Sequence, residues 1–183
     1  MKATGIVRRI DDLGRVVVPK EIRRTLRIRE GDPLEIFTDR QGEVILKKYS
    51  PIGELNEFAS EYAASLNETT GHITLISDRD NVIAISGGSK KTYLNKRLSP
   101  ELEKLIEGKE TYLTEGNTKP IRITAEEYSP EDYISQVISP IISQGDPIGS
   151  VILLSKENNE AMGELEVKLC DTASRFLSKQ MEQ

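Results

Sequence analysis

Residues 5–26 read GIVRRIDDLGRVVVPKEIRRTL, and this stretch decides the fold of the first part of the chain. Residues 5–10 and 15–18 are rich in Ile and Val, so we expect each of them to form a short strand. Residues 11–14, DDLG, lie between the two, and Asp and Gly are typical turn residues. The pattern therefore predicts two strands joined by a turn.

A short helix should follow these strands. Pro19 suits the first turn of a helix, because its missing N–H has no partner there in any case. Residues 20–26, KEIRRTL, place Ile22 and Leu26 four positions apart on one face. We expect that face to be the buried side of the helix.

Two further strands complete this first part. Residues 34–38 and 43–48 are strand-like, and residues 39–42, DRQG, predict a hairpin loop with glycine at its end. A unit of about 50 residues buries a limited fraction of its surface and is marginal as a monomer. Because a second copy would enlarge the core and cover strand edges, we expect a homodimer through residues 1–50.

The charge of the chain is unevenly distributed. The whole chain carries 25 Lys and Arg against 30 Asp and Glu, which alone argues against a nucleic-acid-binding protein. Residues 1–50, however, hold 12 basic against 8 acidic residues, and residues 1–29 hold 9 against 3. A basic first part joined to an acidic remainder is the asymmetry expected when one segment binds a polyanion.

The boundary between the two parts lies at residues 49–53, YSPIG, where Ser-Pro disfavours continuation of the strand. We assign residues 1–50 to a first domain, 51–55 to a linker that leads into a helix, and 56–183 to a second domain. Residues 54–66 and 162–181 carry apolar side chains at helical spacing. The stripe of the last helix is expected to hold Met162, Leu165, Leu169, Ala173, Phe176, Leu177 and Met181.

Strands and short helices alternate between these two long helices. Residues 144–147, QGDP, predict a turn, and Ser99 should cap a helix that begins at Pro100. The order of a helix, several strands and a helix predicts an α+β fold with an antiparallel sheet. The expected strands are 72–77, 82–86, 111–114, 121–124, 134–143 and 150–155, and the expected short helices are 93–98 and 100–106.

Each of the two expected domains resembles a known family. Residues 1–37, MKATGIVRRIDDLGRVVVPKEIRRTLRIREGDPLEIF, resemble the DNA-binding domain of the AbrB-like transition-state regulators, and this likeness extends over residues 1–50. It implies a swapped-hairpin β-barrel dimer, in which two chains interleave their strands. Residues 51–183 resemble a GAF-like domain in element order and in VISPIISQGDPIGSVILLSKE, residues 137–157. That likeness implies an antiparallel sheet with flanking helices and a regulatory role.

The resemblance also implies a function. It describes a sequence-specific transcriptional regulator of late sporulation genes, acting as activator, repressor or both, with double-stranded DNA as its partner. The positions that match the family's DNA-contacting arginines are Arg8, Arg15, Arg23 and Arg24, and we add Lys2 and Arg9 as lesser candidates. Strand periodicity does not separate Arg8 from Arg9, because adjacent residues point to opposite faces.

Arginine suits this role, because its planar fork of donors fits phosphate oxygens and the edge of guanine. The alternative interpretation is that these arginines only pair with Asp11, Asp12 and Glu21.

The helices expected at 54–66 and 162–181 allow two interpretations. Their apolar stripes could belong to the core of one domain, which is the commoner case. They could instead pack between chains as a helical bundle. The family resemblance favours the second and implies a homotetramer with a DNA-binding dimer at each end. It also leaves room for a small-molecule effector bound by the GAF-like domain.

Other features of the sequence give weaker indications of function. Residues 87–92, GGSKKT, lack the spacing of a phosphate-binding P-loop, so we expect a loop that at most borders a sensor pocket. His72 is the single histidine and Cys170 the single cysteine, so we expect no metal site and no cofactor, with Cys170 as a buried packing residue. The chain has no apolar run of 18 residues and no signal-peptide pattern, so we expect a cytoplasmic protein with no membrane partner.

Three rival functions compete with that of a regulator. An enzyme is disfavoured, because no nucleophile–base pair or metal cluster is visible in the sequence. An antitoxin-type autoregulator is disfavoured, because such proteins usually carry a short disordered tail, whereas residues 51–183 have the pattern of a folded domain. An architectural DNA-binding protein with little sequence preference stays open.

Overall fold

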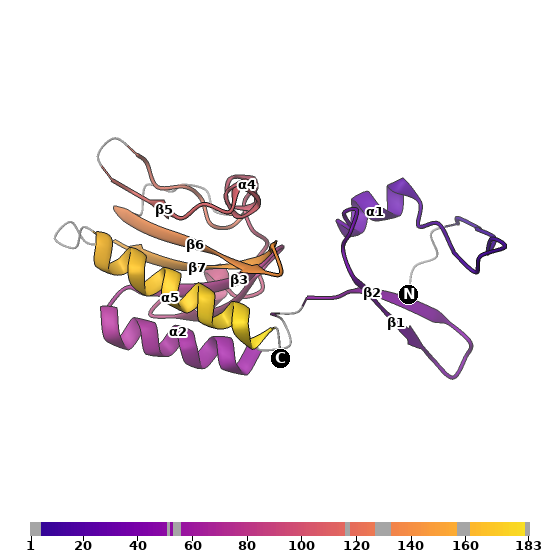
Figure 1. The fold of residues 1–183 in the computed structure, drawn as a ribbon, viewed down its shortest axis with the longest axis horizontal. Coiled ribbons are helices and arrows are strands. Elements are labelled where there is room, and N and C mark those ends of the chain that lie inside the picture. The colour runs from indigo at the N-terminus through magenta and orange to yellow at the C-terminus, as the bar shows by residue number, and fades with distance from the viewer. Residues whose placement is uncertain are drawn as a thin grey trace. The chain divides into compact units, whose positions relative to one another are not determined.

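The computed structural model describes residues 5–50, 52, 56–115, 118–126, 133–156 and 162–181. The chain divides into two compact units, Met1–Tyr49 and Ser50–Gln183, which we call unit 1 and unit 2 and describe separately (Figure 1). Most of the linker expected at 51–55 lies outside the described residues; Ile52 is described and is fully buried in unit 2.

Unit 1 contains one helix and one hairpin. Helix α1 spans Lys20–Leu26. Strands β1 (Leu34–Thr38) and β2 (Val44–Lys48) pair antiparallel, with Ile36 opposite Leu46. The predicted helix and the predicted second hairpin are therefore confirmed.

The strands expected at residues 5–10 and 15–18 are wrong for the chain on its own, because neither segment is a strand in the structure. The turn between them does form, with the N–H of Asp11 bonded to the carbonyl of Arg15 at 3.0 Å. A strand needs a neighbour for its backbone groups along its whole length. Among the described residues of a single chain, no strand pairs with either segment.

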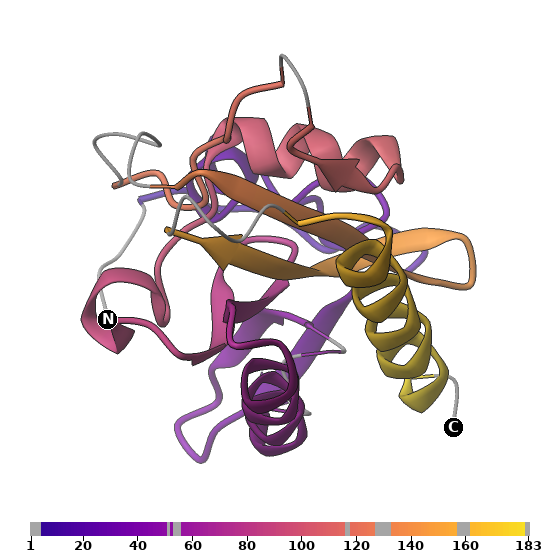
Figure 2. The same ribbon diagram turned by 90° about the vertical axis from the view of Figure 1, so that its left-hand side faces the viewer.

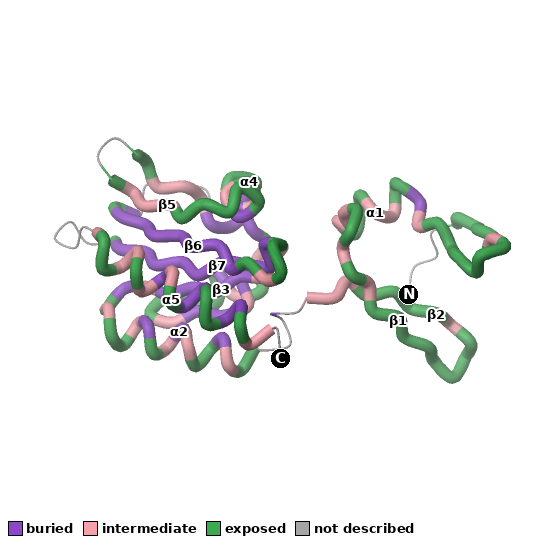
Figure 3. The backbone as a smooth tube through the Cα atoms, viewed as in Figure 1, coloured by how far each residue is buried: buried purple, intermediate pink, exposed green. Residues whose placement is uncertain are grey.

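The buried side expected for α1 is also wrong. No residue of α1 is buried, and Leu26 is 55% exposed. In fact no large hydrophobic residue described in unit 1 is buried, as the mostly green trace of this unit shows (Figure 3). Hydrophobic side chains can only be buried against other apolar surface, and the described part of unit 1 offers too little of it.

Unit 2 is a five-stranded antiparallel sheet with helices on both faces. The strand order is β4-β3-β7-β6-β5. Its elements in chain order are α2 (Asn56–Thr70), β3 (Ile73–Asp78), β4 (Val82–Ser86), α3 (Lys90–Tyr93), α4 (Pro100–Gly108), β5 (Tyr112–Leu113), β6 (Ser135–Ser143), β7 (Asp146–Ser155) and α5 (Glu164–Gln180). The expectation of an α+β fold with antiparallel sheets is confirmed.

Helices α2 and α5 lie side by side on one face of the sheet, and α4 covers the other (Figures 1 and 2). Each face carries its own core: Val137 and Leu153 belong to the cluster under α2 and α5. Ile138 and Ile152 belong to the cluster under α4. Because successive side chains of a strand point to opposite faces, two buried faces explain the unbroken runs of buried residues in β6 and β7.

Several local predictions for unit 2 are confirmed. Ser99 caps α4, its hydroxyl accepting from the N–H of Leu102 at 3.0 Å. The turn between β6 and β7 places Gln144 (φ 50°) and Gly145 (φ 89°) in the left-handed region. Two such residues are the mark of a tight two-residue hairpin turn.

Two predicted elements are wrong because tertiary contacts take their backbone groups. The helix expected at 93–98 stops at Tyr93, and the N–H of Asn95 donates to the carbonyl of Val82 at 2.8 Å. The strand expected at 121–124 does not form. There the side-chain amide of Gln136 donates to the carbonyl of Ile121 at 2.8 Å and accepts from its N–H at 2.9 Å.

The apolar stripe expected along the last helix is wrong in two members. The buried face of α5 holds Cys170, Ala173 and Leu177, whereas Leu165 is 65% and Phe176 40% exposed. Leu165, Leu169 and Phe176 repeat at spacings of four and seven residues, so they form a second stripe beside the first. Cys170 is buried as expected, and burial raises the pKa of its thiol.

Candidate nucleic-acid interface

Asp11 organises the loop that carries Arg15. Its Oδ1 accepts hydrogen bonds from the N–H of Leu13 at 3.0 Å and of Arg15 at 2.8 Å. Gly14 has a φ of +75°, and its N–H donates to the carbonyl of Asp11 at 3.0 Å. The left-handed conformation favours glycine, so Asp11 and Gly14 together specify the turn.

The loop between β1 and β2 is built in the same way. Oδ1 of Asp39 accepts from the N–H of Gln41 at 2.9 Å and of Glu43 at 2.8 Å, and Gly42 has a φ of +84°. Both loops therefore follow the pattern Asp-x-x-Gly-x. They differ in the last residue, which is Arg15 in the first loop and Glu43 in the second.

Arg15 also pairs with Asp11 through its side chain. Its Nε lies 2.8 Å from Oδ2 of Asp11, and the Arg15 side chain remains 69% exposed. The backbone and side-chain hydrogen bonds from Arg15 hold the pKa of Asp11 below its usual 3.8. The alternative that the arginines only neutralise nearby acids thus has support at Arg15.

The helix arginines lie in the last turn of α1. Arg24 is exposed, whereas Arg23 is half-buried, with its Nε buried and without a hydrogen-bond partner among the described residues. Two cations at the carboxyl end of a helix also favour its dipole, which is a structural reason for them. Neither arginine makes an ion pair within the described chain.

A buried ion pair fixes α1 against the hairpin, and sequence reasoning missed it. Nζ of Lys48 lies 3.2 Å from Oδ2 of Asp32, whose side chain is 1% exposed, and donates to the carbonyl of Arg27 at 3.2 Å. Arg27 ends the helix with a φ of 55°. The one visible signal was the pair of lysines, Lys47 and Lys48, that ends the otherwise apolar strand β2. Lys48 and Asp32 therefore position the turn that carries Arg23 and Arg24.

The structure separates the predicted residues into two groups. Arg8, Arg9 and Arg15 are exposed on the arms and tip of the first loop, which projects away from α1 (Figure 1). Arg23 and Arg24 lie on α1. Lys2 lies outside the described residues. No hydrogen bond or ion pair joins the two groups within the described part of one chain.

The β1–β2 hairpin exposes apolar side chains on both of its faces. Ile36 (66% exposed) and Leu46 (41%) are opposite each other on one face, and Phe37 (41%) and Ile45 (39%) on the other. A two-stranded ribbon is at best marginally stable in water, and one that is apolar on both faces needs cover on both.

Two negative findings concern other kinds of site. Within the described ranges, no three His, Cys, Asp or Glu side chains gather as metal ligands would. None of the described helices has the length and apolar character needed to cross a bilayer.

Comparisons with known proteins divide the chain near the same place. Residues 7–54 match the family model "Antidote-toxin recognition MazE, bacterial antitoxin". Residues 54–182 match "Stage V sporulation protein T C-terminal, transcription factor". The transition state regulatory protein AbrB of Bacillus subtilis (strain 168) is 63% identical over 51 residues, which is 28% of this chain and 52% of that protein.

Two further relatives cover the second unit. A solved GAF domain from a phosphoenolpyruvate-protein phosphotransferase of Coxiella burnetii covers 70% of this chain and 82% of its own, with 20% identity and a TM-score of 0.56. Stage V sporulation protein T of Bacillus subtilis (strain 168) is 58% identical over 183 residues, which is all of both chains. With an AbrB-like first unit and a GAF-like second unit, the chain belongs to the stage V sporulation protein T family of transcription factors.

Proposed function

We propose that the chain regulates late sporulation genes by binding their promoters through the arginines of unit 1. The observation that carries the proposal is a set of exposed arginines on a basic unit whose described residues form no core of their own. Family membership and the AbrB-like first unit support DNA as the partner. Whether the chain activates or represses a gene would depend on the promoter.

The binding form is a dimer of unit 1 in which two chains interleave their hairpins. Twelve large hydrophobic residues of unit 1 are exposed in the single chain, against four in the described part of unit 2. Nε of Arg23 and Oε2 of Glu43 are both buried without a partner among the described residues. A second copy would bury the exposed hydrophobic residues and offer hydrogen-bond partners to these two polar atoms. Buried polar atoms are rarely left unpaired.

The dimer would bind DNA mainly through its phosphates. Two copies of Arg8, Arg15, Arg23 and Arg24 offer about eight contacts, which corresponds to a slope of about −7 in log affinity against log salt. Arg9 and Lys2 would add to these. The described residues of unit 1 have only one short helix, so we expect DNA shape to contribute to specificity beside a few base contacts.

Unit 2 would join two such dimers into a tetramer. In the second stripe of α5, formed by Leu165, Leu169 and Phe176, Leu165 and Phe176 stay exposed in one chain, whereas Leu169 packs partly against the core. Phe176 continues into an aromatic seam on α2, with ring centroids 5.5 Å from Tyr62 and 5.7 Å from Phe58. Two dimers held together gain DNA affinity through effective concentration.

Regulation rather than catalysis is the role we assign to unit 2. Its GAF-like fold supports a small-molecule effector, although a fold alone does not establish a function. The antitoxin alternative has support in the match over residues 7–54. It is weaker, because residues 54–182 form a folded unit of the transcription-factor family. A protein that binds promoters must be in the compartment that holds the chromosome, so we expect it to act in the cytoplasm.

Binding to promoter fragments, compared with random DNA at matched salt, tests the proposal. A regulator should prefer the promoters by a factor of about 10³ or more. Equal affinity for both would favour an architectural protein, and no affinity for either would overturn DNA binding altogether.

A further inference from the structure

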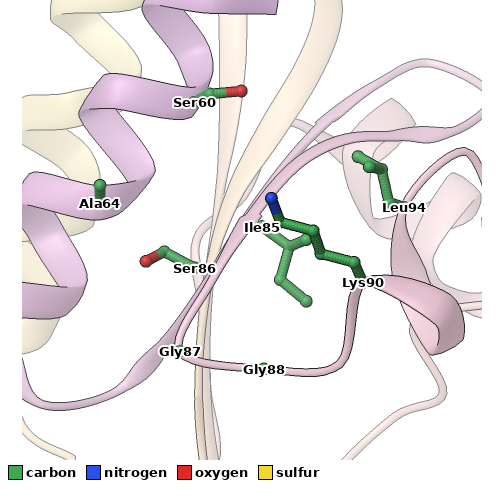
Figure 4. Close-up of a pocket in the computed structure, with 8 residues that line it drawn as sticks. All are labelled: Ser60, Ala64, Ile85, Ser86, Gly87, Gly88, Lys90 and Leu94. Atoms are coloured by element: carbon green, nitrogen blue, oxygen red, sulfur yellow. The ribbon is translucent and has the colours of Figure 1, made fainter.

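A cavity of about 310 Å³ opens between α2 and the segment that follows β4 (Figure 4). Its size lies at the lower end of the range for small-molecule sites. Ser60 and Ala64 line it from α2, and the other lining residues are Ile85, Ser86, Gly87, Gly88, Lys90 and Leu94. The cavity thus includes Gly87, Gly88 and Lys90 of the GGSKKT segment, which the DNA-binding role does not use.

The wall formed by Gly87 and Gly88 is held in a fixed shape. A Cβ on Gly87 would lie 2.3 Å from Nδ2 of Asn67, and Gly87 has a φ of +74°. A Cβ on Gly88 would lie 2.9 Å from Cγ2 of Ile73. Asn67 is itself fixed, since its Nδ2 donates to the carbonyl of His72 at 2.8 Å. The cavity is therefore formed before any ligand arrives.

Lys90 is the one charged residue in the lining. Its side chain is exposed, points across the mouth of the cavity (Figure 4) and has no partner among the described residues. The neighbouring Lys96 differs, because its Nζ pairs with Glu126 at 2.6 Å. Residues 87–97 hold four cations and no acid, in the part of the chain that is otherwise acidic. This segment would attract an anion.

The two serines of the cavity can each accept a hydrogen bond from a ligand. The hydroxyl of Ser60 donates to the carbonyl of Asn56 at 2.8 Å, and that of Ser86 donates to Oδ1 of Asn67 at 3.2 Å. A hydroxyl has one proton and two lone pairs, so both groups are left as acceptors. Ile85, Ala64 and Leu94 supply an apolar surface beside them.

We propose that this cavity binds a small organic carboxylate that also carries a hydroxyl or amino donor and a short apolar part. The carboxylate would pair with Lys90, the donor with Ser60 or Ser86, and the apolar part with Ile85 and Leu94. The proposal assigns a binding site to the small-molecule effector of the proposed function, and it rests on the existence of such an effector. DNA binding does not depend on it.

The test uses the full chain and three probes of nearly one shape. Mandelate has the carboxylate, the hydroxyl and an apolar ring; mandelamide lacks the charge, and phenylacetate lacks the hydroxyl. Titration calorimetry gives the affinities, and methyl NMR signals of Ile85 and Leu94 report the place of binding. Lys90→Met removes the charge but keeps the alkyl stem, and Lys91→Met is the matched control, since Lys91 is exposed but does not line the cavity.

Mandelate should shift the Ile85 and Leu94 signals in a saturable way and bind roughly three- to tenfold more tightly than mandelamide. Lys90→Met should erase that difference and leave mandelamide binding unchanged, whereas Lys91→Met should change neither. Ala64→Leu, which fills the cavity, should weaken all three probes. Phenylacetate, which lacks the hydroxyl, should bind several-fold more weakly than mandelate.

Three results would overturn the site. These are no saturable shift up to about 10 mM mandelate, a range that covers weak ligands, equal affinity for mandelate and mandelamide, or equal loss in Lys91→Met and Lys90→Met. Promoter binding by the same variants without probe should match the unaltered chain. A failed site therefore leaves the DNA-binding proposal untouched, and a failure of DNA binding shows separately.

Discussion

Asp11 holds Arg15 at two points: Oδ2 accepts from Nε of Arg15 at 2.8 Å, and Oδ1 accepts from its backbone N–H at 2.8 Å. The same carboxylate shapes the turn and competes with any phosphate for the guanidinium. Asp39 shapes its own loop through the same two backbone contacts, but Glu43 stands where Arg15 would be. The two aspartates thus offer a natural pair for separating turn formation from DNA contact.

Asp11→Asn should tighten promoter binding by about two- to fivefold at low salt, the range expected for one exposed ion pair. The amide oxygen can still accept the turn's hydrogen bonds, while the negative charge beside the DNA is gone. Fluorescence anisotropy with labelled promoter DNA measures the change. Asp39→Asn is the control and should leave affinity unchanged; weaker binding in Asp11→Asn would mean that the ion pair orients Arg15 for DNA.

Arg15→Ala and Arg24→Ala should each abolish promoter binding and leave melting temperature and oligomeric state unchanged. Both side chains are exposed, so their loss removes phosphate contacts without opening a core. Arg40→Ala, an exposed arginine in the β1–β2 loop, serves as the control for general charge loss. Gel-shift titration at two salt concentrations checks the result, and unchanged binding in either variant would refute the proposed surface.

Ile36→Asp should dissociate the unit 1 dimer and abolish DNA binding. Ile36 is 66% exposed in the single chain, so a charge there costs little unless a second chain covers it. Light scattering coupled to size exclusion reports the mass. Glu35→Gln, the adjacent position on the opposite face of the hairpin, should have no effect. A variant that keeps its mass and DNA affinity would argue against the interleaved dimer.

Phe176→Ala should convert the tetramer to a dimer and weaken binding to DNA with two sites more than to DNA with one. The ring of Phe176 stacks on Tyr62 and Phe58 and is 40% exposed, so its removal weakens a surface more than a core. Lys179→Ala, one turn away and exposed, is the control. Sedimentation velocity distinguishes the two masses, and a tetramer that persists would place the junction elsewhere.

Asp78→Asn should raise the melting temperature at pH 7 by roughly 2–4 °C, the shift that about 1 kcal/mol causes in a chain of this size. Burial raises the pKa of Asp78 above 3.8, although its Oδ1 accepts from the N–H of Asp80 and Asn81. The folded chain therefore holds this proton more tightly than the unfolded one. The associated stabilisation is full below about pH 3.8 and is lost as the pH rises through the folded pKa.

The advantage of Asp78→Asn should accordingly shrink as the pH falls toward that of the protonated acid. Thermal melts followed by circular dichroism between neutral and acid pH measure it. Asp146→Asn, at an exposed position, should show no such trend. If Asp78→Asn lowers the melting temperature at every pH, the bond from the Ser50 hydroxyl to Oδ2 matters more than the buried charge.

Local signals in the sequence predicted the features that depend on a few neighbouring residues. The loop at Asp39–Gly42, the Ser99 cap and the tight turn at Gln144 and Gly145 all form as expected. Each is decided by a side chain that bonds to its own backbone or by a residue that tolerates a positive φ. The candidate arginines came from the family motif, and their contact with DNA stays a prediction.

Features that depend on contacts between distant residues were not predicted from the sequence. Gln136 takes the place of a strand beside Ile121, and nothing in residues 121–124 signals a side-chain partner 15 positions away. The pair of Lys48 and Asp32 likewise joins two segments with no shared pattern. Leu165 and Phe176 fit one helical stripe by hydrophobicity, yet only the position of the sheet decides which apolar face of α5 is buried.

The sequence by itself determined that a basic segment precedes an acidic α+β domain, because charge, turn residues and apolar periodicity depend on neighbouring residues. The likeness of the first segment to the AbrB-like regulators came from its motif in residues 5–26. Only the tertiary structure decided which apolar residues find cover within one chain. Unit 2 buries its sheet on both faces, whereas unit 1 leaves Ile36 and Phe37 exposed on opposite faces of one hairpin. Burial is a property of the surfaces that meet, and no stretch of sequence specifies its own partner.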